Sequence, residues 1–495
     1  MSTLRNAINN EMKWTKTENG ADALNTTGTK RLDFFAQSGS MRNIDVVDKV
    51  ALFDDAWAED ARDALVLLFH TRNIRGGYGE RDTFNQILAH LGDKAPETVE
   101  KNLWAILEFG RAKDLYSLIG TGAENAMWKF MKEQFYLDYE NMKAGKGISL
   151  LAKWIALPDS KSEATKALGK KTSRALGFKF QDERKFKTMT REMRTYLDIP
   201  EAKMATGRWG EIEYAKCASR FLLSNRKAFE KHDKERWDEY LASVNKGEAN
   251  MNMSTVNPCD IFNKVYHGEK GKELNTMWKA LPNLCDKDAL VITDTSGSMW
   301  WDDNKSGNMY PGAVAWSIAA YYAERNRGAL HKLFMTFDDH PEFVELQGDT
   351  LESYIRTFRA HSRYGSTNMQ AAFELLLDTC IKGNVKPEDM PEALIIVSDM
   401  QINCVKGIDS DGRITIFEAM KKKFEAAGYK LPQVVFWNVA VRKPTFLASK
   451  DDNGASLVSG YSVNILKNVF DSIGTTPYEL MRAVIDQPVY EKITL

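Results

Sequence analysis

The 495-residue sequence lacks the features that mark secreted, membrane-spanning and zinc-binding proteins. No stretch approaches the ~18 consecutive apolar residues of a membrane span, and residues 1–20 lack the apolar core of a secretory signal. The cysteines are few, odd in number and never in a C-x-x-C pair: Cys217, Cys259, Cys285, Cys380 and Cys404. This usage favours neither a disulfide framework nor a zinc site, and it is typical of thiols in a reducing compartment. We therefore expect a soluble, cytoplasmic protein without a membrane partner.

A strong net charge is also absent. The 67 Lys and Arg residues almost balance the 68 Asp and Glu residues, giving a formal net charge of −1. Overall charge therefore favours neither nucleic acid nor a membrane surface as a partner, and such an interaction must depend on local patches. At roughly 100–200 residues per domain, the length predicts two or three domains.

Strand-like runs are missing from residues 44–240, where apolar residues recur every three or four positions. Leu103, Ile106 and Phe109 illustrate this helical spacing. Successive amphipathic helices without strands must bury their apolar faces against one another. The pattern predicts a helical bundle or a solenoid, although no strict sequence period is visible. We expect an all-helical domain of HEAT-like repeats over residues 31–285. The preceding residues 1–30, rich in Asn, Thr, Glu and Gly, are expected to form a flexible arm.

The pattern changes near residue 286, where short apolar runs begin to alternate with helical segments. Runs at residues 289–293, 332–337, 393–397 and 433–439 are expected to form buried strands. Strands that alternate with helices predict a mostly parallel sheet covered on both faces. The expected fold class is α plus α/β, in which the helical half is followed by a doubly wound, Rossmann-like domain over residues 286–495.

Oxygen-bearing side chains gather where these strands are expected to end. The first strand runs into Asp294-Thr-Ser-Gly-Ser298, another ends in Ser398-Asp399, and a loop that opens a helix contains Thr367. Ligands of open α/β sheets bind at the carboxyl ends of the strands. Carboxylates and hydroxyls, without imidazole or thiolate, suit Mg²⁺ or Mn²⁺. The predicted metal ligands are Asp294, Ser296, Ser298, Thr367 and Asp399.

This set resembles the metal-ion-dependent adhesion site of von Willebrand A domains, and the resemblance covers most of residues 286–495. In that family an Asp-x-Ser-x-Ser loop, a Thr and an Asp surround the metal, whose open position takes a carboxylate from a partner. The resemblance implies a domain that binds an acidic protein ligand and does not catalyse a reaction.

Catalysis by the same residues is the competing interpretation. An aspartyl-phosphate phosphatase usually has a second Asp two residues after the first, where this sequence has Ser296. A serine nucleophile needs a neighbouring base, and His361 precedes the Thr367 loop, but the sequence has no G-x-S-x-G elbow. We therefore expect a protein that is not an enzyme. A metal-dependent phosphohydrolase ranks behind the two binding functions described below.

Two stretches of the helical half concentrate positive charge. Arg72, Arg75 and Arg81 surround a glycine-rich turn, where guanidinium groups and backbone amides can bind phosphate. A structural turn in which the arginines pair with Glu80 and Asp82 is the alternative.

Residues 161–194 form the second stretch, in which eleven basic residues face four acidic ones, a net charge of +7. Such a cluster can neutralise several phosphates and bind nucleic acid in a salt-dependent way, although a solvated helix face has a similar composition. The predicted RNA-binding residues of both stretches are Arg72, Arg75, Arg81, Lys170, Lys171, Arg174, Arg184 and Lys185.

Several short motifs together resemble a family of plant, fungal and large-virus proteins that joins a helical half to a C-terminal von Willebrand A-like domain. The motifs are Phe109-Gly-Arg-Ala-Lys-Asp114, Leu151-Ala-Lys-Trp154, Asp198-Ile-Pro-Glu201, Trp209-Gly-Glu-Ile-Glu-Tyr214, Phe436-Trp437-Asn438 and Gly460-Tyr461-Ser462. That family is similar in layout to the Ro (TROVE) ribonucleoproteins, in which a ring of helical repeats binds small structured RNAs and admits RNA 3′ ends.

These resemblances imply a ring-like ribonucleoprotein that binds structured or single-stranded RNA and carries a metal-dependent A domain. The alternative, from another class of function, is a protein-interaction scaffold that captures an acidic partner at the metal site.

Overall fold

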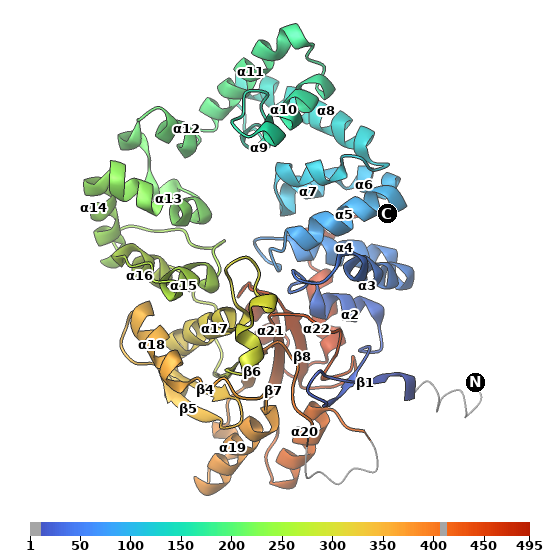
Figure 1. Cartoon of the computed structure of the whole chain (residues 1–495), viewed down its shortest axis with the longest axis vertical. Coiled ribbons are helices and arrows are strands. Elements are labelled where there is room, and N and C mark those ends of the chain that lie inside the picture. The colour runs from blue at the N-terminus through green and yellow to red at the C-terminus, as the bar shows by residue number, and fades with distance from the viewer. Residues whose placement is uncertain (1–10, 406–412) are drawn as a thin grey trace, which may run out of the picture. The chain divides into compact units, whose positions relative to one another are not determined.

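The structure, a computed structural model, describes residues 11–405 and 413–495 (Figure 1). Its contacts divide the chain into two compact units. The first contains the described residues up to Thr71 together with Arg75–Thr83 and Met253–Glu491, and the second contains Arg72–Ile74, Phe84–Asn252 and Lys492–Leu495. The second unit is helical and the first contains a six-stranded sheet, so the predicted α plus α/β class is confirmed.

The sheet of the first unit has the strand order β5-β4-β3-β6-β7-β8. Every neighbouring pair is parallel except β4 and β5, which are antiparallel. The strands are β3 (Ala289–Asp294), β4 (Leu333–Phe337), β5 (Glu342–Glu345), β6 (Ala393–Ser398), β7 (Gln433–Asn438) and β8 (Ala455–Ser459). The chain passes from β3 outward to β4 and returns to the other side of β3 as β6. The strand order therefore reverses between β3 and β6, and such a switch point is where open α/β sheets bind ligands.

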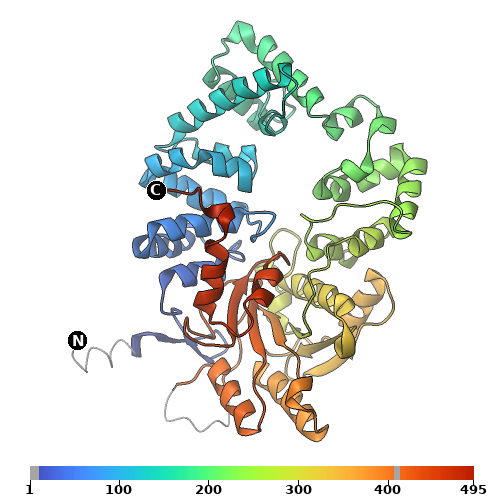
Figure 2. The ribbon, with the colours of Figure 1, turned by 180° about the vertical axis from the view of Figure 1, so that it is seen from behind.

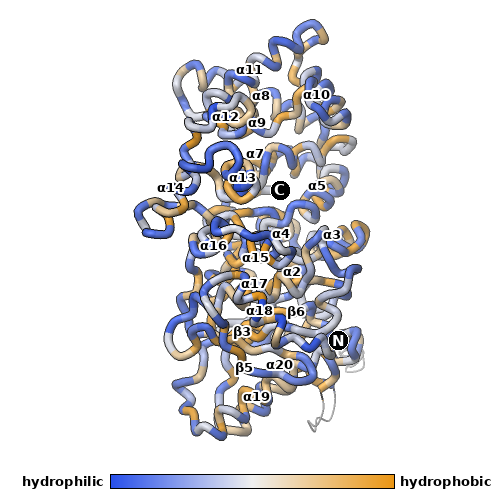
Figure 3. Tube along the Cα trace, turned by 60° about the vertical axis from the view of Figure 1, so that its left-hand side comes forward, coloured by the Kyte–Doolittle hydropathy of each residue, from blue (hydrophilic) through white to orange (hydrophobic). Residues whose placement is uncertain are grey.

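Helices cover both faces of this sheet because its central strands are apolar on both sides. Leu290 and Ile292 of β3 lie in one core with α19 and α20, and alternate residues of a strand point to opposite faces. The helix α17 packs directly against β3, β4 and β6. Over it lies α15, which contacts both α17 and α18. The bounds are α15 (Pro258–Tyr266), α16 (Lys272–Lys279), α17 (Pro311–Arg325), α18 (Leu351–His361), α19 (Met369–Lys382) and α20 (Ile416–Ala426). Hydrophobic residues run through β3 and β6 (Figure 3).

The first unit also brings together segments that lie far apart in the sequence. The helix α22 (Pro477–Ile485) packs against α2 (Lys30–Gln37) and α21 (Ile465–Asp471), and both α2 and α22 pack against β8 (Figure 2). The helices α3 (Val46–Glu59) and α4 (Ala61–Arg72) follow α2 in the chain.

Two expectations about domain limits are corrected by these contacts. Helices α2, α3, α15 and α16 fall in the predicted helical domain of residues 31–285, yet they group with the sheet because α2 packs on β8 and α15 on α17. The flexible arm predicted for residues 1–30 is wrong for its described part. There β1 (Trp14–Lys16) and β2 (Asp22–Leu24) form an antiparallel hairpin, and Ala21, Ala23 and Leu24 are buried in the core beside α19 and α20.

The second unit consists of helices packed on one another, and their repeat character stays a prediction. A cluster of aromatic rings, Phe135, Tyr136, Phe178 and Phe186, joins α8, α11 and the segment that precedes α11. The helices are α5 (Asp82–Lys94), α6 (Pro96–Lys101), α7 (Leu103–Phe109), α8 (Glu124–Lys143), α9 (Leu151–Trp154), α10 (Glu163–Ala175), α11 (Glu183–Tyr196), α12 (Pro200–Ala205), α13 (Ser219–His232) and α14 (Lys234–Asn245). Within residues 11–405 and 413–495, no helix is long and apolar enough to cross a membrane.

One buried side chain of the first unit makes its stability depend on pH. His70 is 1% exposed, and its Nδ1 lies 3.0 Å from the hydroxyl of Tyr490. Burial lowers the pKa of His70 from 6.5 to about 3, because the apolar surroundings disfavour the imidazolium. Unfolding releases this constraint and lets the imidazole take up a proton. The free energy of unfolding should therefore fall by about 1.4 kcal/mol per pH unit as the pH drops below about 6.5.

We expect His70→Asn to flatten this dependence, because the variant has no imidazole to protonate in the unfolded chain. Chemical unfolding at pH 7 and pH 5 measures the difference, and His331→Asn is the control because His331 is exposed. A His70→Asn variant with the wild-type difference would contradict the assignment.

Candidate metal centre

The predicted ligand loop begins where β3 ends. Asp294 is the last residue of β3, and Gly297–Trp300 form a short 3-10 helix that turns the chain back over the strand end. The amide of Ser296 donates to Oδ1 of Asp294 at 2.8 Å. The hydroxyls of Ser296 and Ser298 lie 3.2 Å apart. The three predicted ligands of this loop are therefore grouped.

The neighbouring strand β6 brings the second carboxylate to the same place. Its last residue, Ser398, donates its hydroxyl to Oδ2 of Asp294 at 2.6 Å, and Ser298 donates to Oδ2 of Asp399 at 3.0 Å. Asp294 is 0% exposed and Asp399 is 1% exposed. Parallel pairing of β3 with β6 thus places two buried carboxylates around a shared set of hydroxyls.

The fifth predicted ligand, Thr367, is buried in an adjacent loop. That loop is joined to the first because the amide of Gly297 donates to the carbonyl of Gly365 at 3.1 Å. The carbonyl of Thr367 accepts from the amide of Asn403 at 2.8 Å. Among the described residues, the Thr367 hydroxyl contacts Asn19 Nδ2 at 3.4 Å and bonds directly to none of the other four predicted ligands.

Two residues near the candidate ligands have a positive φ, a backbone conformation that residues other than glycine rarely adopt. Tyr364, in the Thr367 loop, has φ of +57°, and Met400, directly after Asp399, has φ of +61°. Such conformations cost of order 1–3 kcal/mol each and gather at ligand-binding sites. Surrounding hydrogen bonds hold them, including the 3.0 Å bond from the Met400 amide to the Ser398 hydroxyl.

The electrostatics of the pair favour a cation. Burial, followed by the negative charge of Asp399, raises the pKa of Asp294 to about 7, against hydrogen bonds from Ser296 and Ser398 that lower it. A divalent ion would remove the cost of placing these carboxylates side by side in an apolar interior.

The five predicted ligands suit a hard ion, because each would bind it through a side-chain oxygen. The described residues contain no group of three or more His, Cys, Asp and Glu that could hold a metal. Serine and threonine hydroxyls and water would therefore have to complete the coordination, and Mg²⁺ ordinarily keeps several waters.

Sequence reasoning missed Arg442, the cation that the chain itself supplies to this site. It lies in the loop after β7, and its Nη2 is 3.0 Å from Oδ2 of Asp399 and 2.9 Å from Oε2 of Glu18. Its guanidinium also stands 5.6 Å from the centre of the Trp301 ring. No motif surrounds Arg442 in the sequence, so only the fold reveals its role.

The turn of the β1–β2 hairpin covers the loops that carry Thr367 and Asp399. Thr17 donates its hydroxyl to the carbonyl of Ile402 at 2.6 Å, and the amide of Glu18 donates to Oε1 of Gln401 at 2.8 Å. Asn19 donates to the carbonyl of Gln401. A segment predicted to be a flexible arm is thus part of the site.

The geometry separates His361 from the serines. Its Nδ1 lies 3.1 Å from Oε1 of Glu342, whereas Ser298 donates to a carboxylate. In the described part of the chain, neither serine has the histidine partner that a nucleophile needs.

The predicted phosphate-binding turn is corrected at Arg72. This side chain is 2% exposed, and its Nη2 lies 2.7 Å from a carboxylate oxygen of Asp114, which is equally buried. Arg72 is therefore part of the packing of the second unit, and its buried guanidinium is not accessible to RNA. Arg75 and Arg81 are exposed, and Arg81 forms an ion pair with Asp82.

The other predicted RNA-binding residues lie on two helices that both pack on α8. Lys170 and Lys171 lie on α10 with Arg174, whereas Arg184 and Lys185 begin α11. Lys171 pairs with Glu124 at 2.6 Å. Lys170 is half-buried, whereas Arg174, Arg184 and Lys185 are exposed.

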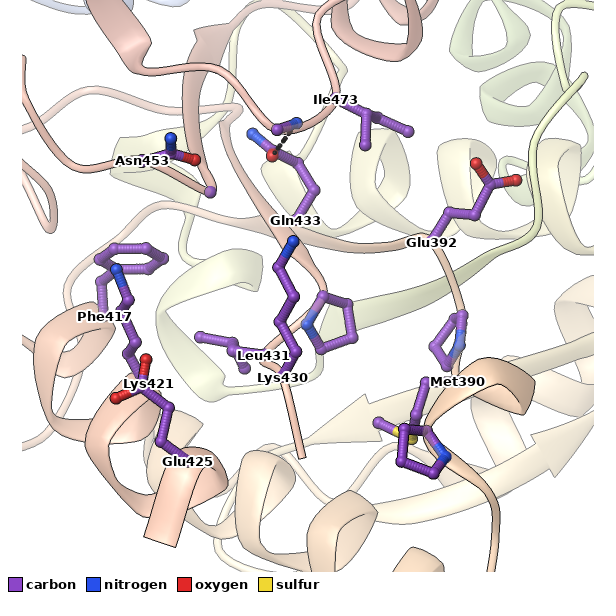
Figure 4. A pocket seen from close by; sticks show the side chains of 15 residues that line it. Met390, Glu392, Phe417, Lys421, Glu425, Lys430, Leu431, Gln433, Asn453 and Ile473 are labelled. Carbon is purple, nitrogen blue, oxygen red and sulfur yellow. Dashed lines mark hydrogen bonds between the residues drawn. The ribbon is translucent and has the colours of Figure 1, made fainter. Parts of the chain in front are cut away.

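A pocket of about 540 Å³ opens at the other end of the strands from the candidate metal ligands, beside the amino ends of β6 and β7 (Figure 4). Phe417 and Lys421 come from α20, Lys430 and Gln433 flank the start of β7, and Glu392 precedes β6. Gln433 Oε1 accepts from the amide of Gly474 at 2.9 Å. No sequence motif pointed to this pocket, and it is separate from the candidate metal ligands.

Comparison with known proteins assigns the chain to a family. Residues 17–149 and 148–287, more than half of the sequence, match the family described as "Domain of unknown function (DUF2828)". The chain belongs to this family. Residues 288–486 match a second family, "Domain of unknown function (DUF7788)". In this DUF2828 protein the two matches meet within a few residues of the boundary expected after residue 285.

Two individual proteins are similar over almost the full length. "Uncharacterized protein L728" of Acanthamoeba polyphaga mimivirus is 26% identical over 521 residues, which cover 96% of this chain and 88% of that protein. The crystal structure of the Deinococcus radiodurans RO (RSR) protein matches at 12% identity with a TM-score of 0.35, covering 91% of this chain and 93% of that one. This structural likeness is too distant to support an argument about function.

Arg442 should matter most when no divalent ion is bound. Replacing it by Gln leaves two buried carboxylates without a cation, which should lower the free energy of unfolding by about 3 kcal/mol in the presence of a chelator. Among the described residues, the neighbouring exposed Lys443 donates only to the carbonyl of Lys16. Lys443→Gln is therefore the matched control and should change stability by less than about 0.5 kcal/mol. Denaturant unfolding measures both variants, and equal losses would show that Arg442 does not compensate the pair.

Proposed function

We propose that this DUF2828 protein binds RNA without acting as an enzyme, and that the RNA contacts lie on α10 and α11. The observation that carries this proposal is the excess of basic side chains without acidic partners on these helices and in the residues beside them. Among the eleven basic residues of 161–194, Lys166, Lys171 and Lys187 form ion pairs, and Arg194 donates to backbone carbonyls. The others form no ion pair with a described residue: Lys161, Lys170, Arg174, Lys179, Arg184, Lys185 and Arg191.

The local carboxylates do not neutralise this excess. Glu163 is paired with Lys166, and Glu192 accepts a hydrogen bond from the hydroxyl of Tyr139 at 2.9 Å. Solvated helix faces ordinarily intersperse both signs of charge, often in pairs three or four residues apart. A face with unpaired cations favours a polyanion, because each phosphate it neutralises releases a condensed counterion.

We further propose that the carboxylates and hydroxyls at the ends of β3 and β6 bind Mg²⁺ or Mn²⁺, in the manner of a von Willebrand A domain. The buried carboxylate pair supports this, since burial and the Asp399 charge both raise the pKa of Asp294. Asp294, Asp399 and the serines would supply oxygens, and the ion would stabilise the site and offer a position to an outside ligand.

Capture of an acidic protein at this site is the second candidate function. Arg442 favours it, because the same guanidinium nitrogen contacts buried Asp399 and the exposed carboxylate of Glu18. The rim of the site thus already holds a carboxylate from the hairpin turn. A partner's Asp or Glu would meet the same cationic surroundings.

The basic face yields a prediction on salt dependence. The double variant Arg184→Gln/Lys185→Gln should weaken binding of a single-stranded RNA about tenfold near physiological salt. It should also reduce the slope of log K against log salt by about 0.7 for each phosphate that the protein no longer neutralises. Fluorescence anisotropy at several salt concentrations measures both quantities. The matched control is Lys216→Gln/Lys234→Gln, which removes two exposed charges of the same unit that are paired with Glu213 and Asp238. Equal binding by both variants would refute the proposal.

The metal site yields a prediction on thermal unfolding. Mg²⁺ or Mn²⁺ at 100 times its Kd should stabilise the wild type by about 2.7 kcal/mol, and Asp294→Asn should abolish this gain while leaving RNA affinity intact. The exposed Asp302 of the next turn pairs with Lys305, so Asp302→Asn should keep the metal response. An unchanged response in Asp294→Asn would exclude the site. If Asp294→Asn loses a protein partner but still binds RNA, capture of an acidic protein at the metal site is favoured.

A further inference from the structure

An exposed aromatic ring stands between the two basic helices. α10 ends at Ala175 and α11 begins at Glu183, and the connection contains a short 3-10 helix, Phe180–Asp182. Phe180 is 77% exposed, whereas Phe178, two residues earlier, is 5% exposed. The connection therefore buries one phenyl ring and leaves the other in water.

The buried ring fixes the connection on the rest of the unit. Phe178 stacks on Tyr136 with a centroid distance of 6.1 Å and an interplanar angle of 19°. It also contacts Phe135 at 6.0 Å and Phe186 at 5.3 Å. Because α8 and α11 both hold Phe178, Phe180 is presented from an anchored segment, which limits the entropy cost when a ligand packs on it.

The charge around Phe180 decides what kind of ligand its ring suits. A single exposed apolar residue is ordinary on a protein surface. Here Lys179, Arg184 and Lys185 lie within five residues of Phe180, and none forms an ion pair with a residue in the described ranges. The nearby carboxylates, Asp182 and Glu183, are half-buried at the start of α11, where the helix dipole favours negative charge.

An aromatic ring surrounded by cations matches a chain of alternating bases and phosphates. Single-stranded nucleic acids bind to proteins by stacking bases on aromatic rings while Lys and Arg hold the backbone. A duplex hides its base faces inside the helix and leaves only phosphates and groove edges to contact. The exposed ring therefore favours an unpaired segment of RNA over a duplex.

We propose that Phe180 is a base-stacking residue for single-stranded RNA. The ring takes the face of an unpaired base, and Lys179, Arg184 and Lys185 contact the flanking phosphates. This inference rests on the proposed RNA-binding function and adds to it the class of RNA and the residue that distinguishes that class.

The test compares three labelled probes by fluorescence anisotropy with the full chain: an oligouridylate, an abasic oligomer of the same length and an RNA duplex. Phe180→Ala and Phe180→Leu should each weaken oligouridylate binding about tenfold, the range expected for removing one base–aromatic stack. Both should leave abasic and duplex binding unchanged, and Phe180→Trp should restore oligouridylate affinity. The salt slope should stay at the wild-type value, because the variants keep every basic side chain that neutralises a phosphate.

The controls separate stacking from general effects on the surface. Leu137 is 55% exposed on α8, so Leu137→Ala removes a comparable apolar side chain and should leave all three affinities unchanged. Wild-type affinity in Phe180→Leu would overturn stacking in favour of a simple apolar contact. Equal weakening of the abasic probe by Phe180→Ala would overturn the contact with a base.

The outcomes also separate this inference from the function on which it rests. If Arg184→Gln/Lys185→Gln weakens all three probes while Phe180→Ala weakens none, stacking is wrong and RNA binding stands. If the wild type binds none of the probes, or if the double variant binds them as tightly as the wild type, RNA binding on this face is wrong as well.

Discussion

Two buried carboxylates side by side are the constraint around which the sheet-containing unit is organised. Asp294 ends β3 and Asp399 directly follows β6, and the parallel register of these neighbouring strands brings the two carboxylates together. Several kcal/mol are needed to bury each charge, so the surroundings must compensate. Hydroxyls of Ser298 and Ser398 donate to the pair, and Arg442 reaches Asp399 from the loop after β7. Buried apolar residues of β3 and β6 hold this arrangement in place.

The two units carry candidate sites for different kinds of ligand. The sheet-containing unit concentrates oxygen donors and like charge at one strand edge, which suits a small hard cation. The helical unit instead carries, on and beside α10 and α11, Lys and Arg side chains that form no ion pair with a described residue, which suits an extended polyanion. Each unit carries its candidate site with its own residues, so the two proposals can fail independently.

The sequence predicted local features well and long-range ones poorly. The apolar runs at residues 289–293, 393–397 and 433–439 became β3, β6 and β7, and four of the five expected metal ligands are joined by hydrogen bonds. Arg442 was not foreseen because nothing local distinguishes an arginine that meets a carboxylate 43 positions away. Arg72 was assigned to the wrong surroundings for the same reason, since its buried partner Asp114 is remote in the sequence. The hairpin at residues 14–24 escaped notice because distant residues hold it, such as Ile402, whose carbonyl accepts from Thr17 385 positions earlier.

The hairpin's contacts with residues 401 and 402 have a consequence for how the chain is made. The sheet-containing unit is assembled from the start of the chain and from Met253 onward, whereas most of the helical unit, Phe84–Asn252, is continuous. Domains fold as their residues leave the ribosome, at about 5–20 residues per second. The helical unit can therefore fold while the loops that carry the candidate metal ligands are still unsynthesised. The β1–β2 hairpin must wait through the translation of that unit for the core in which Ala21, Ala23 and Leu24 are buried. Any chaperone that acts on the nascent chain would meet the apolar residues of β2 during that interval.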